Sequence, residues 1–547
     1  MSSNIDSNDI SKIVKMLDSI NTRLSALEAA GNLLQSTEKP ELSNQEVSTI
    51  IKKESSEDLE FRLGEQWFGK IGIIAFLLAV FNFLILPFET IPQNIILILG
   101  FVISLVLIGT SISVTKLLKN LAGYTLGSGL ILLYVSTLRL HYFTSDPLLS
   151  SKPFLIILLY VVTSISLVFS LKKKSPYIGA LALLFFYVAT LVSDFPILIF
   201  IALIMGGIGV SFLDKMNNWN VLSLIATLLT YFVHLLWYIN NPVIGKEIMI
   251  VQGWDINLLA IPIYLVVFGL ANANKHTVEV DDFYAIQKTT LNSIAGFGLF
   301  IFILLNSNIS YTGLITLGFS AVLLSIASVY WTKQKSKYST FLYSMLAYSS
   351  LSVSIVLTFS SPDYFIWLCW QSLAVVSTAL WFKSKIIVVA NFFIFLLIAL
   401  VYLAGTGDIS ISALSFGVVA LISARIMNWQ KERLELKTEN LRISYLIIAF
   451  LIIPIVLYYN LPSQFVGISY IVLAFVYYLL GRLINNKKYR LLATGTLILS
   501  LVYIFIFGLT SSETIYKILS FLLVSIALVI ISIVYAKVRA KEKTIGA

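Results

Sequence analysis

Long apolar stretches separated by short polar turns fill most of this chain. From residue 70 onward we count eighteen apolar segments, most of them 17 to 24 residues long. A helix rises 1.5 Å per residue, so about 20 residues cross the roughly 30 Å of bilayer hydrocarbon. These segments are apolar on all sides, whereas the strands of a membrane barrel alternate apolar and polar residues. We therefore predict an all-α, polytopic membrane protein with about eighteen transmembrane helices in antiparallel hairpins, beginning near residues 70, 94, 121, 153, 177, 196, 219, 256, 283, 309, 338, 362, 386, 408, 441, 464, 489 and 514.

A different period precedes the apolar segments. Apolar residues there alternate spacings of three and four, which is typical of a coiled-coil seam. The alternative is an amphipathic helix that lies on the protein or on the membrane surface. The seam predicts a homo-oligomer or a partner helix that binds through residues 10–34, and it consists of Ile10, Ile13, Leu17, Ile20, Leu24 and Leu27.

Composition divides the chain into four regions. Residues 1–35 form the cytoplasmic helix, and residues 36–68 are a polar linker with the segment that leads into the membrane. The linker is too polar to bury a core. Residues 69–536 are the multi-pass transmembrane domain, and residues 537–547 are a basic cytoplasmic tail.

Basic residues alternate between the turns. If the N-terminus is cytoplasmic, the inner turns and the tail carry 26 Lys and Arg, the outer turns carry 4, and 8 precede the first span. Basic residues resist translocation, so we predict that both termini are cytoplasmic in a bacterial cytoplasmic (inner) membrane. Lys172, Lys333, Lys383 and Lys487 mark inner hairpins at multiples of about 52 residues, which suggests a tandem hairpin repeat.

The composition also narrows the functional classes. Hydrophobic residues make up 58% and charged residues 12% of the chain, and its formal net charge is +10. The basic residues lie in membrane turns rather than on a soluble face, so we predict membrane lipids as partners and no nucleic acid. No P-loop pattern appears, and three dispersed histidines with one cysteine predict no metal site, no cofactor and no catalytic residue.

One polar cluster is a candidate binding site. Tyr134, Arg139 and His141 approach the outer end of the third span, and His234 approaches the outer end of the seventh. Together they would suit an anionic group or a lipid headgroup on the outer side. The alternative is that Arg139 only extends to the interface, as long basic side chains do.

Glycines predict where helices approach one another closely. Small residues at such spacing allow close backbone packing in lipid, although an unwound helix along a substrate path would also use them. The residues are Gly123, Gly127, Gly129, Gly206, Gly207 and Gly209.

Three short motifs have a familiar form. They consist of Leu59, Glu60, Gly64, Trp67 and Gly72, then Gly123, Gly127, Gly129 and Tyr134, and finally Lys517, Ser520, Phe521 and Tyr535. With these motifs the chain resembles the bacterial predicted membrane protein family known as domain of unknown function 2339. The resemblance implies an N-terminal coiled coil, a polar linker and many spans, and it implies no activity. The family's penultimate span often carries a Lys and an Asp, which "LVYIFIFG" lacks.

Three functions stay open at this point. The first is a non-ATP-driven transporter or a protein that handles lipids or envelope polymers, because many spans are joined by minimal loops. The second is a membrane scaffold assembled through the coiled coil. The third, a membrane-embedded transferase, is the least favoured because no soluble catalytic domain fits in the loops.

Overall fold

The computed structural model describes most of the apolar part of the chain. The described residues are 69–86, 91–114, 119–144, 147–254, 256–273, 283–307, 309–405, 409–429 and 439–506, with four single positions beyond them. Within these ranges the regular structure is helical and no strand occurs. The predicted coiled coil, the linker and the basic tail lie outside the described residues and stay predictions. The chain forms two compact units, Met1–Ser145 (unit 1) and Asp146–Ala547 (unit 2).

Unit 1 contains three described helices, α3 (Gly69–Ile85), α4 (Gln93–Val114) and α5 (Lys119–Arg139). Helix α5 packs on both α3 and α4. The Ser111 hydroxyl donates a hydrogen bond of 2.8 Å to the carbonyl of Ala122 and so joins α4 to α5. The small apolar core consists of Val80, Leu84, Ile96, Leu132 and Val135.

Unit 2 contains fourteen described α-helices. Two short 3₁₀ helices, η2 (Pro242–Ile244) and η4 (Ile411–Ala413), and a π turn, η3 (Tyr330–Gln334), accompany them. The α-helices are α6 (Lys152–Lys173), α7 (Pro176–Ser193), α8 (Pro196–Asn217), α9 (Asn220–Tyr238), α10 (Asn257–Ala273), α11 (Phe283–Leu305), α12 (Thr312–Val329), α13 (Lys337–Thr358), α14 (Asp363–Trp381), α15 (Lys385–Gly405), α16 (Leu414–Trp429), α17 (Glu439–Asn460), α18 (Ser463–Leu483) and α19 (Lys487–Ile506).

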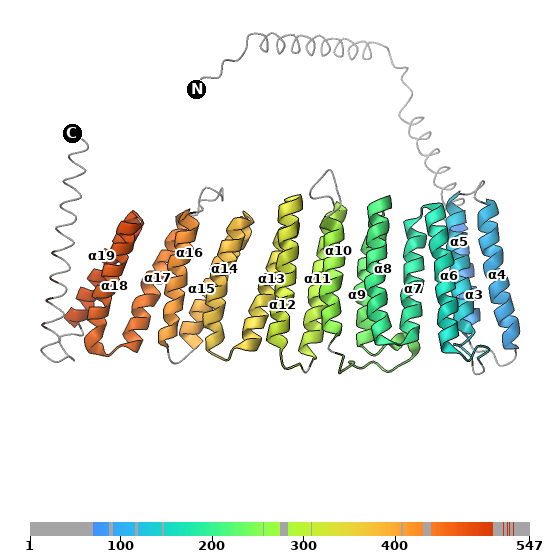
Figure 1. Cartoon of the computed structure of the whole chain (residues 1–547), viewed down its shortest axis with the longest axis horizontal. Coiled ribbons are helices and arrows are strands. Elements are labelled where there is room, and N and C mark those ends of the chain that lie inside the picture. Colours follow the sequence, from blue (N-terminus) through green and yellow to red (C-terminus); the bar gives the residue numbers. More distant parts are fainter. Residues whose placement is uncertain are drawn as a thin grey trace, which may run out of the picture. The chain divides into compact units, whose positions relative to one another are not determined.

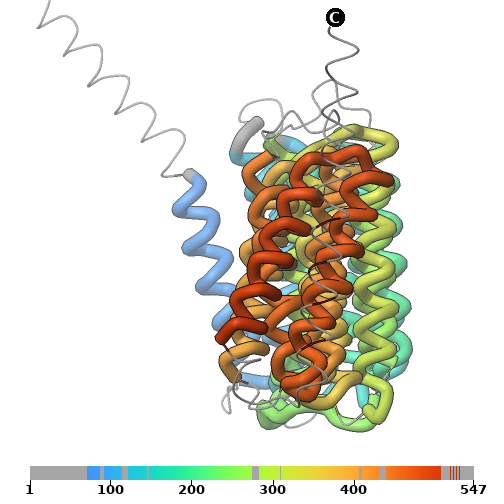
Figure 2. Tube along the Cα trace, turned by 90° about the vertical axis from the view of Figure 1, so that its left-hand side faces the viewer, coloured from blue at the N-terminus to red at the C-terminus, as the bar shows by residue number. Residues whose placement is uncertain are grey.

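The helices of unit 2 form antiparallel hairpins that follow one another in chain order (Figure 1). Helices α8, α10 and α12 pack in one row, and α7, α9, α11 and α13 pack in a second row beside it. Viewed along these rows, the helices lie behind one another in a narrow stack with α18 and α19 in front (Figure 2). Successive hairpins begin 44 to 61 residues apart, close to the spacing of about 52 expected from the lysines.

One turn geometry recurs between the two helices of a hairpin. The first helix ends with a non-glycine residue in the left-handed conformation, with φ between 51° and 56°; these residues are Lys174, Asn218, Lys335, Lys383 and Asn485. In three of the turns the next amide donates to the carbonyl five residues earlier, as in a Schellman motif: Ser175 to Ser170, Ser384 to Ala379, and Asn486 to Gly481.

The residue after the left-handed position begins the next helix. The Ser336 hydroxyl accepts a hydrogen bond of 3.2 Å from the amide of Ser339, and Ser175 and Ser384 cap their helices in the same way. Such caps satisfy an amide that has no partner within its helix. Because these turns meet at one end of unit 2, we call that end, with Lys172, Lys335 and Lys383, the basic end (Figure 1).

The predicted spans agree closely with the described helices. The first seventeen predicted segments fall one by one on α3 to α19. By length and composition, fifteen described helices can cross a membrane, while α3 and α10 are shorter apolar helices. The segment predicted near residue 514 lies largely outside the described residues. The all-helical prediction is therefore confirmed for this part of the chain, and its many long apolar helices are compatible with a multi-pass membrane protein.

Candidate functional site

A buried ion pair joins three helices of unit 2. Lys288 Nζ on α11 lies 2.6 Å from Asp214 Oδ2 on α8, and it also donates a hydrogen bond of 2.9 Å to Asn220 Oδ1 on α9. The side chains of Lys288 and Asp214 are only 5% and 8% exposed. A buried charge is costly unless it is paired and hydrogen-bonded, and this arrangement supplies both requirements.

Local structure places the three residues at the basic end. Asp214 lies in the last turn of α8, Asn220 is the first residue of α9, and Lys288 lies in the second turn of α11. The left-handed Asn218 reverses the chain between the first two, so its tight turn brings Asp214 and Asn220 to the same ammonium group.

Further polar side chains lie at the same end of the helices, beside this pair. Asn272 Nδ2 donates to Thr289 Oγ1 at 3.2 Å, and the hydroxyls of Thr289 and Ser339 lie 3.0 Å apart. Gln334 Nε2 donates to the carbonyls of Asn272 and Ala273 at 2.9 and 3.0 Å, so it satisfies the end of α10. These contacts connect α10, α11 and α13 next to the ion pair.

Asn292 is the central link. Its Oδ1 accepts a hydrogen bond of 2.8 Å from the Tyr231 hydroxyl, and its Nδ2 donates to the Tyr343 hydroxyl at 2.9 Å and to the carbonyl of Leu265 at 3.1 Å. Tyr343 in turn stacks on Tyr330, with ring centroids 5.5 Å apart. One amide thus joins α9, α10, α11 and α13 in the apolar interior.

His234 extends the series toward the opposite end of α9. Its Nδ1 lies 3.2 Å from the Tyr264 hydroxyl, and its ring stacks on Phe200 with centroids 5.3 Å apart. The side chain is fully buried, and its Nε2 has no hydrogen-bond partner among the described residues. We call the whole series the polar chain; it consists of Asp214, Asn220, Lys288, Asn272, Thr289, Asn292, Tyr231, Tyr343, Tyr264 and His234.

A second polar cluster lies between two hairpins, where α13 meets α14 and α15. Gln371 Nε2 donates to the carbonyl of Tyr348 and to the Ser352 hydroxyl, both at 2.9 Å, and Asn391 Nδ2 donates to the Ser372 hydroxyl at 2.8 Å. These side chains line a cavity of about 80 Å³. That volume is enough for several water molecules.

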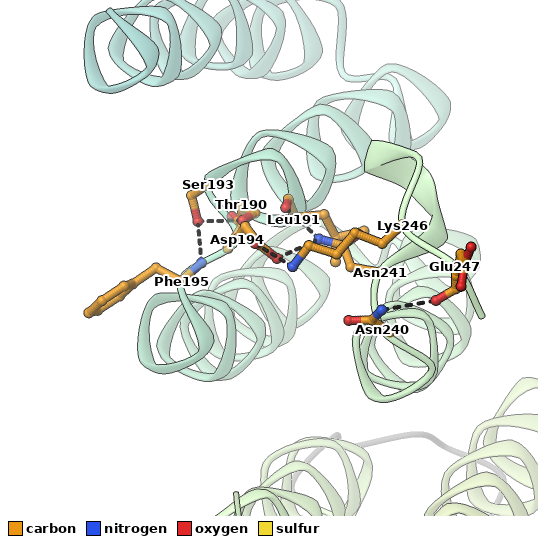
Figure 3. Close-up of polar contacts among 9 residues, drawn as sticks. All are labelled: Thr190, Leu191, Ser193, Asp194, Phe195, Asn240, Asn241, Lys246 and Glu247. Carbon is orange, nitrogen blue, oxygen red and sulfur yellow. Dashed lines mark hydrogen bonds and ion pairs between the residues drawn. The ribbon is translucent and has the colours of Figure 1, made fainter. Parts of the chain in front are cut away.

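The α9–α10 connection lies at the end of unit 2 opposite the basic end (Figure 1). Figure 3 shows its polar contacts with the end of α7 and with Asp194, which follows that helix. Asn241, in the left-handed conformation, donates from Nδ2 to the carbonyl of Leu191 at 2.8 Å and to Asp194 Oδ1 at 3.3 Å. Lys246 Nζ lies 2.6 Å from Asp194 Oδ2, and this ion pair is partly exposed, at 42% and 26%. These contacts fix the connection to the C-terminal end of α7.

The predicted polar cluster is divided between the two units. Tyr134, Arg139 and His141 belong to unit 1, and His234 belongs to unit 2. Arg139 is only 2% exposed, and its Nη1 donates to the carbonyl of Leu84 and, at 3.4 Å, to that of Leu86. These carbonyls terminate α3, so the guanidinium caps that helix. A shared site for these residues and His234 stays a prediction.

The predicted packing glycines fall into two groups. A Cβ atom at Gly129 would lie 3.1 Å from backbone atoms of α4, one at Gly206 would lie 2.6 Å from the Tyr187 hydroxyl, and one at Gly207 would lie 3.1 Å from Phe268. These three permit close approach. Gly123, Gly127 and Gly209 have no atom within 4 Å of the equivalent position.

Sequence reasoning missed the ion pair itself. Asp214 and Lys288 are 74 residues apart, and each lies beside a predicted turn, where charge is ordinary. Only His234 of the polar chain was singled out. Within the described ranges, no group of three or more His, Cys, Asp or Glu could hold a metal ion.

The comparisons with known proteins add no relative. No protein-family model, no curated protein and no solved structure matches the chain.

Proposed function

We propose that the protein is a transporter that works without ATP in a bacterial cytoplasmic membrane. The buried side chains defined above as the polar chain would form its transport site. The observation that carries this proposal is the Asp214–Lys288 pair, buried among apolar helices with Asn220 as a third partner. Ionisable groups within membrane helices are costly, and they typically mark ion or substrate pathways.

The geometry supports a simple coupling between ligand and helix movement. An anion that binds Lys288 would leave Asp214 without its counter-ion, and a proton or cation that binds Asp214 would do the same to Lys288. Because Asp214 lies on α8 and Lys288 on α11, a broken pair favours a rearrangement of these helices. Toward the opposite end, Asn292 and His234 offer the next polar contacts.

Currents across reconstituted membranes test this proposal. Proteoliposomes with the full chain on a solid-supported membrane are given rapid steps of H⁺, Na⁺, phosphate, carboxylates and amines, and the displaced charge is recorded. We expect at least one step to give a current that the Asp214→Asn/Lys288→Met variant loses. The matched control is Asp194→Asn/Lys246→Met, which removes an exposed pair with the same zero change in net charge. Equal currents in the wild type and the first variant would contradict the proposal.

The orientation is part of the same proposal. The basic turns favour a cytoplasmic basic end, and hence cytoplasmic termini. The only native cysteine, Cys369, is fully buried, so a Lys335→Cys variant provides one accessible thiol. We expect an impermeant maleimide to label it in inside-out vesicles and not in intact cells; the opposite pattern would reverse the orientation.

A scaffold is the second candidate, because hydrogen bonds also link neighbouring hairpins. Tyr187 bonds to Thr230 at 2.9 Å between α7 and α9, and Asn391 lies 3.5 Å from Tyr445 between α15 and α17. In lipid such contacts hold helices together where no hydrophobic drive exists. Absence of any current from the wild-type protein would favour this candidate.

The scaffold candidate also depends on the predicted coiled coil. Native mass spectrometry should then show oligomers that a Leu17→Asp/Leu24→Asp variant loses. Membership of the family named above stays a prediction as well.

A further inference from the structure

An apolar groove runs along one face of unit 2. Helices α6 and α8 form its walls, and α7 forms its floor. Its part nearest the basic end is a pocket of about 280 Å³. The residues that line it include Thr163 and Leu167 on α6, Gly179 and Phe186 on α7, and Met205, Gly209 and Leu213 on α8.

The pocket is shorter than one leaflet of a membrane. Its lining runs from Gly179 to Phe186 on α7 and from Met205 to Leu213 on α8, about 11 and 12 Å of helix. One leaflet is half of the roughly 30 Å of bilayer hydrocarbon, so the pocket fits within the leaflet at the basic end. A helix, about 10 Å across, does not fit such a narrow volume, whereas a single acyl chain does.

Positive charge lies at the mouth of the groove. Lys172 and Lys173 end α6, Lys174 follows them in the turn to α7, and all three are exposed. The lining of the pocket contains no charged residue. Exposed lysines beside an apolar pocket that fits within one leaflet are complementary to an anionic headgroup that carries a hydrocarbon chain.

We infer that this groove binds an anionic phospholipid, with one acyl chain between α6 and α8 and the headgroup phosphate at Lys172–Lys174. The site is separate from the polar chain and goes beyond the proposed transport function. It holds whether the protein transports a solute or acts as a scaffold.

Two kinds of variant test the acyl-chain contact and the headgroup contact of the lipid separately. Gly209→Leu places a larger side chain in the pocket. No atom lies within 4 Å of the new Cβ position, so the substitution does not clash with a neighbouring helix. Leu167→Trp fills the pocket from the opposite wall. The matched control is Gly298→Leu on α11, where the Cβ position is also open. The melting temperature of each variant in detergent verifies that it is folded.

The headgroup is tested by Lys172→Gln/Lys174→Gln. Its control is Lys335→Gln/Lys337→Gln, which changes an equally basic turn in which Lys335 has the same left-handed conformation as Lys174. Each lysine near an anionic headgroup contributes about fivefold in affinity, so we expect the first variant to bind roughly 25-fold more weakly.

Native mass spectrometry of the full chain, with dioleoyl phosphatidylglycerol or dioleoyl phosphatidylcholine added, gives the result. We expect the wild type to retain one phosphatidylglycerol in preference to phosphatidylcholine. Both variants that fill the pocket should lose this lipid, and Lys172→Gln/Lys174→Gln should bind it more weakly. Both controls should bind it like the wild type. Equal retention of the two lipids overturns the inference. Unchanged phosphatidylglycerol binding in both variants that fill the pocket also overturns it. An equal loss of binding in the Lys335→Gln/Lys337→Gln control has the same consequence.

Discussion

Breaking the buried ion pair from one side should destabilise the protein far more than breaking an exposed pair. Lys288→Met removes the cation that lies 2.6 Å from Asp214, whose side chain is 8% exposed. Loss of Lys288 leaves the Asp214 carboxylate buried without its counter-ion, which costs about 3–5 kcal/mol. Lys246→Met is the matched comparison, because its pair with Asp194 has the same distance of 2.6 Å but is 42% and 26% exposed. We expect a cost of only about 0–1 kcal/mol there.

The double variant Asp214→Asn/Lys288→Met completes this experiment. It removes both charges at once, so no uncompensated ion is left, and its stability should return to within about 1 kcal/mol of the wild type. The free energy of unfolding is measured in mixed micelles with increasing dodecyl sulfate, with tryptophan fluorescence as the signal. Equal losses of stability in Lys288→Met and Lys246→Met would show that burial does not raise the cost of an unpaired charge here. A double variant less stable than Lys288→Met would show the same.

Three further predictions concern packing, the polar chain and a helix cap. Gly206→Leu drives a side chain against Tyr187 and should lower stability by about 1–3 kcal/mol, whereas Gly209→Leu, with open space, should stay near the wild type in the same unfolding measurement. Asn292→Leu removes three hydrogen bonds and should lower the free energy of unfolding by about 1–2 kcal/mol. An unchanged free energy of unfolding would show that these hydrogen bonds do not stabilise the helix packing. Ser336→Ala removes the cap of α13 and should cost about 1 kcal/mol in thermal unfolding, with no change expected in the currents.

Part of the candidate site could be read from the sequence, and part could not. His234 stood out as a histidine in an apolar run, but nothing in its neighbourhood predicts that its partner is Tyr264 on the next helix. Arg139 stood out as a basic residue near the end of an apolar run. Its partners are the carbonyls of Leu84 and Leu86, 55 and 53 residues earlier, and carbonyls leave no mark in a sequence.

The sequence by itself determined where the helices lie, because the length of an apolar run and the basic turn after it are local properties. Seventeen segments expected from hydropathy fall on the helices α3 to α19. The tertiary structure decided which polar groups meet. The side chain of Lys288 finds Asp214 only because α11 and α8 both pack beside α9, and Gly206 and Gly209 differ only in what the neighbouring helix places against them. Burial and pairing depend on contacts between residues far apart in the chain, so a local pattern carries no record of them.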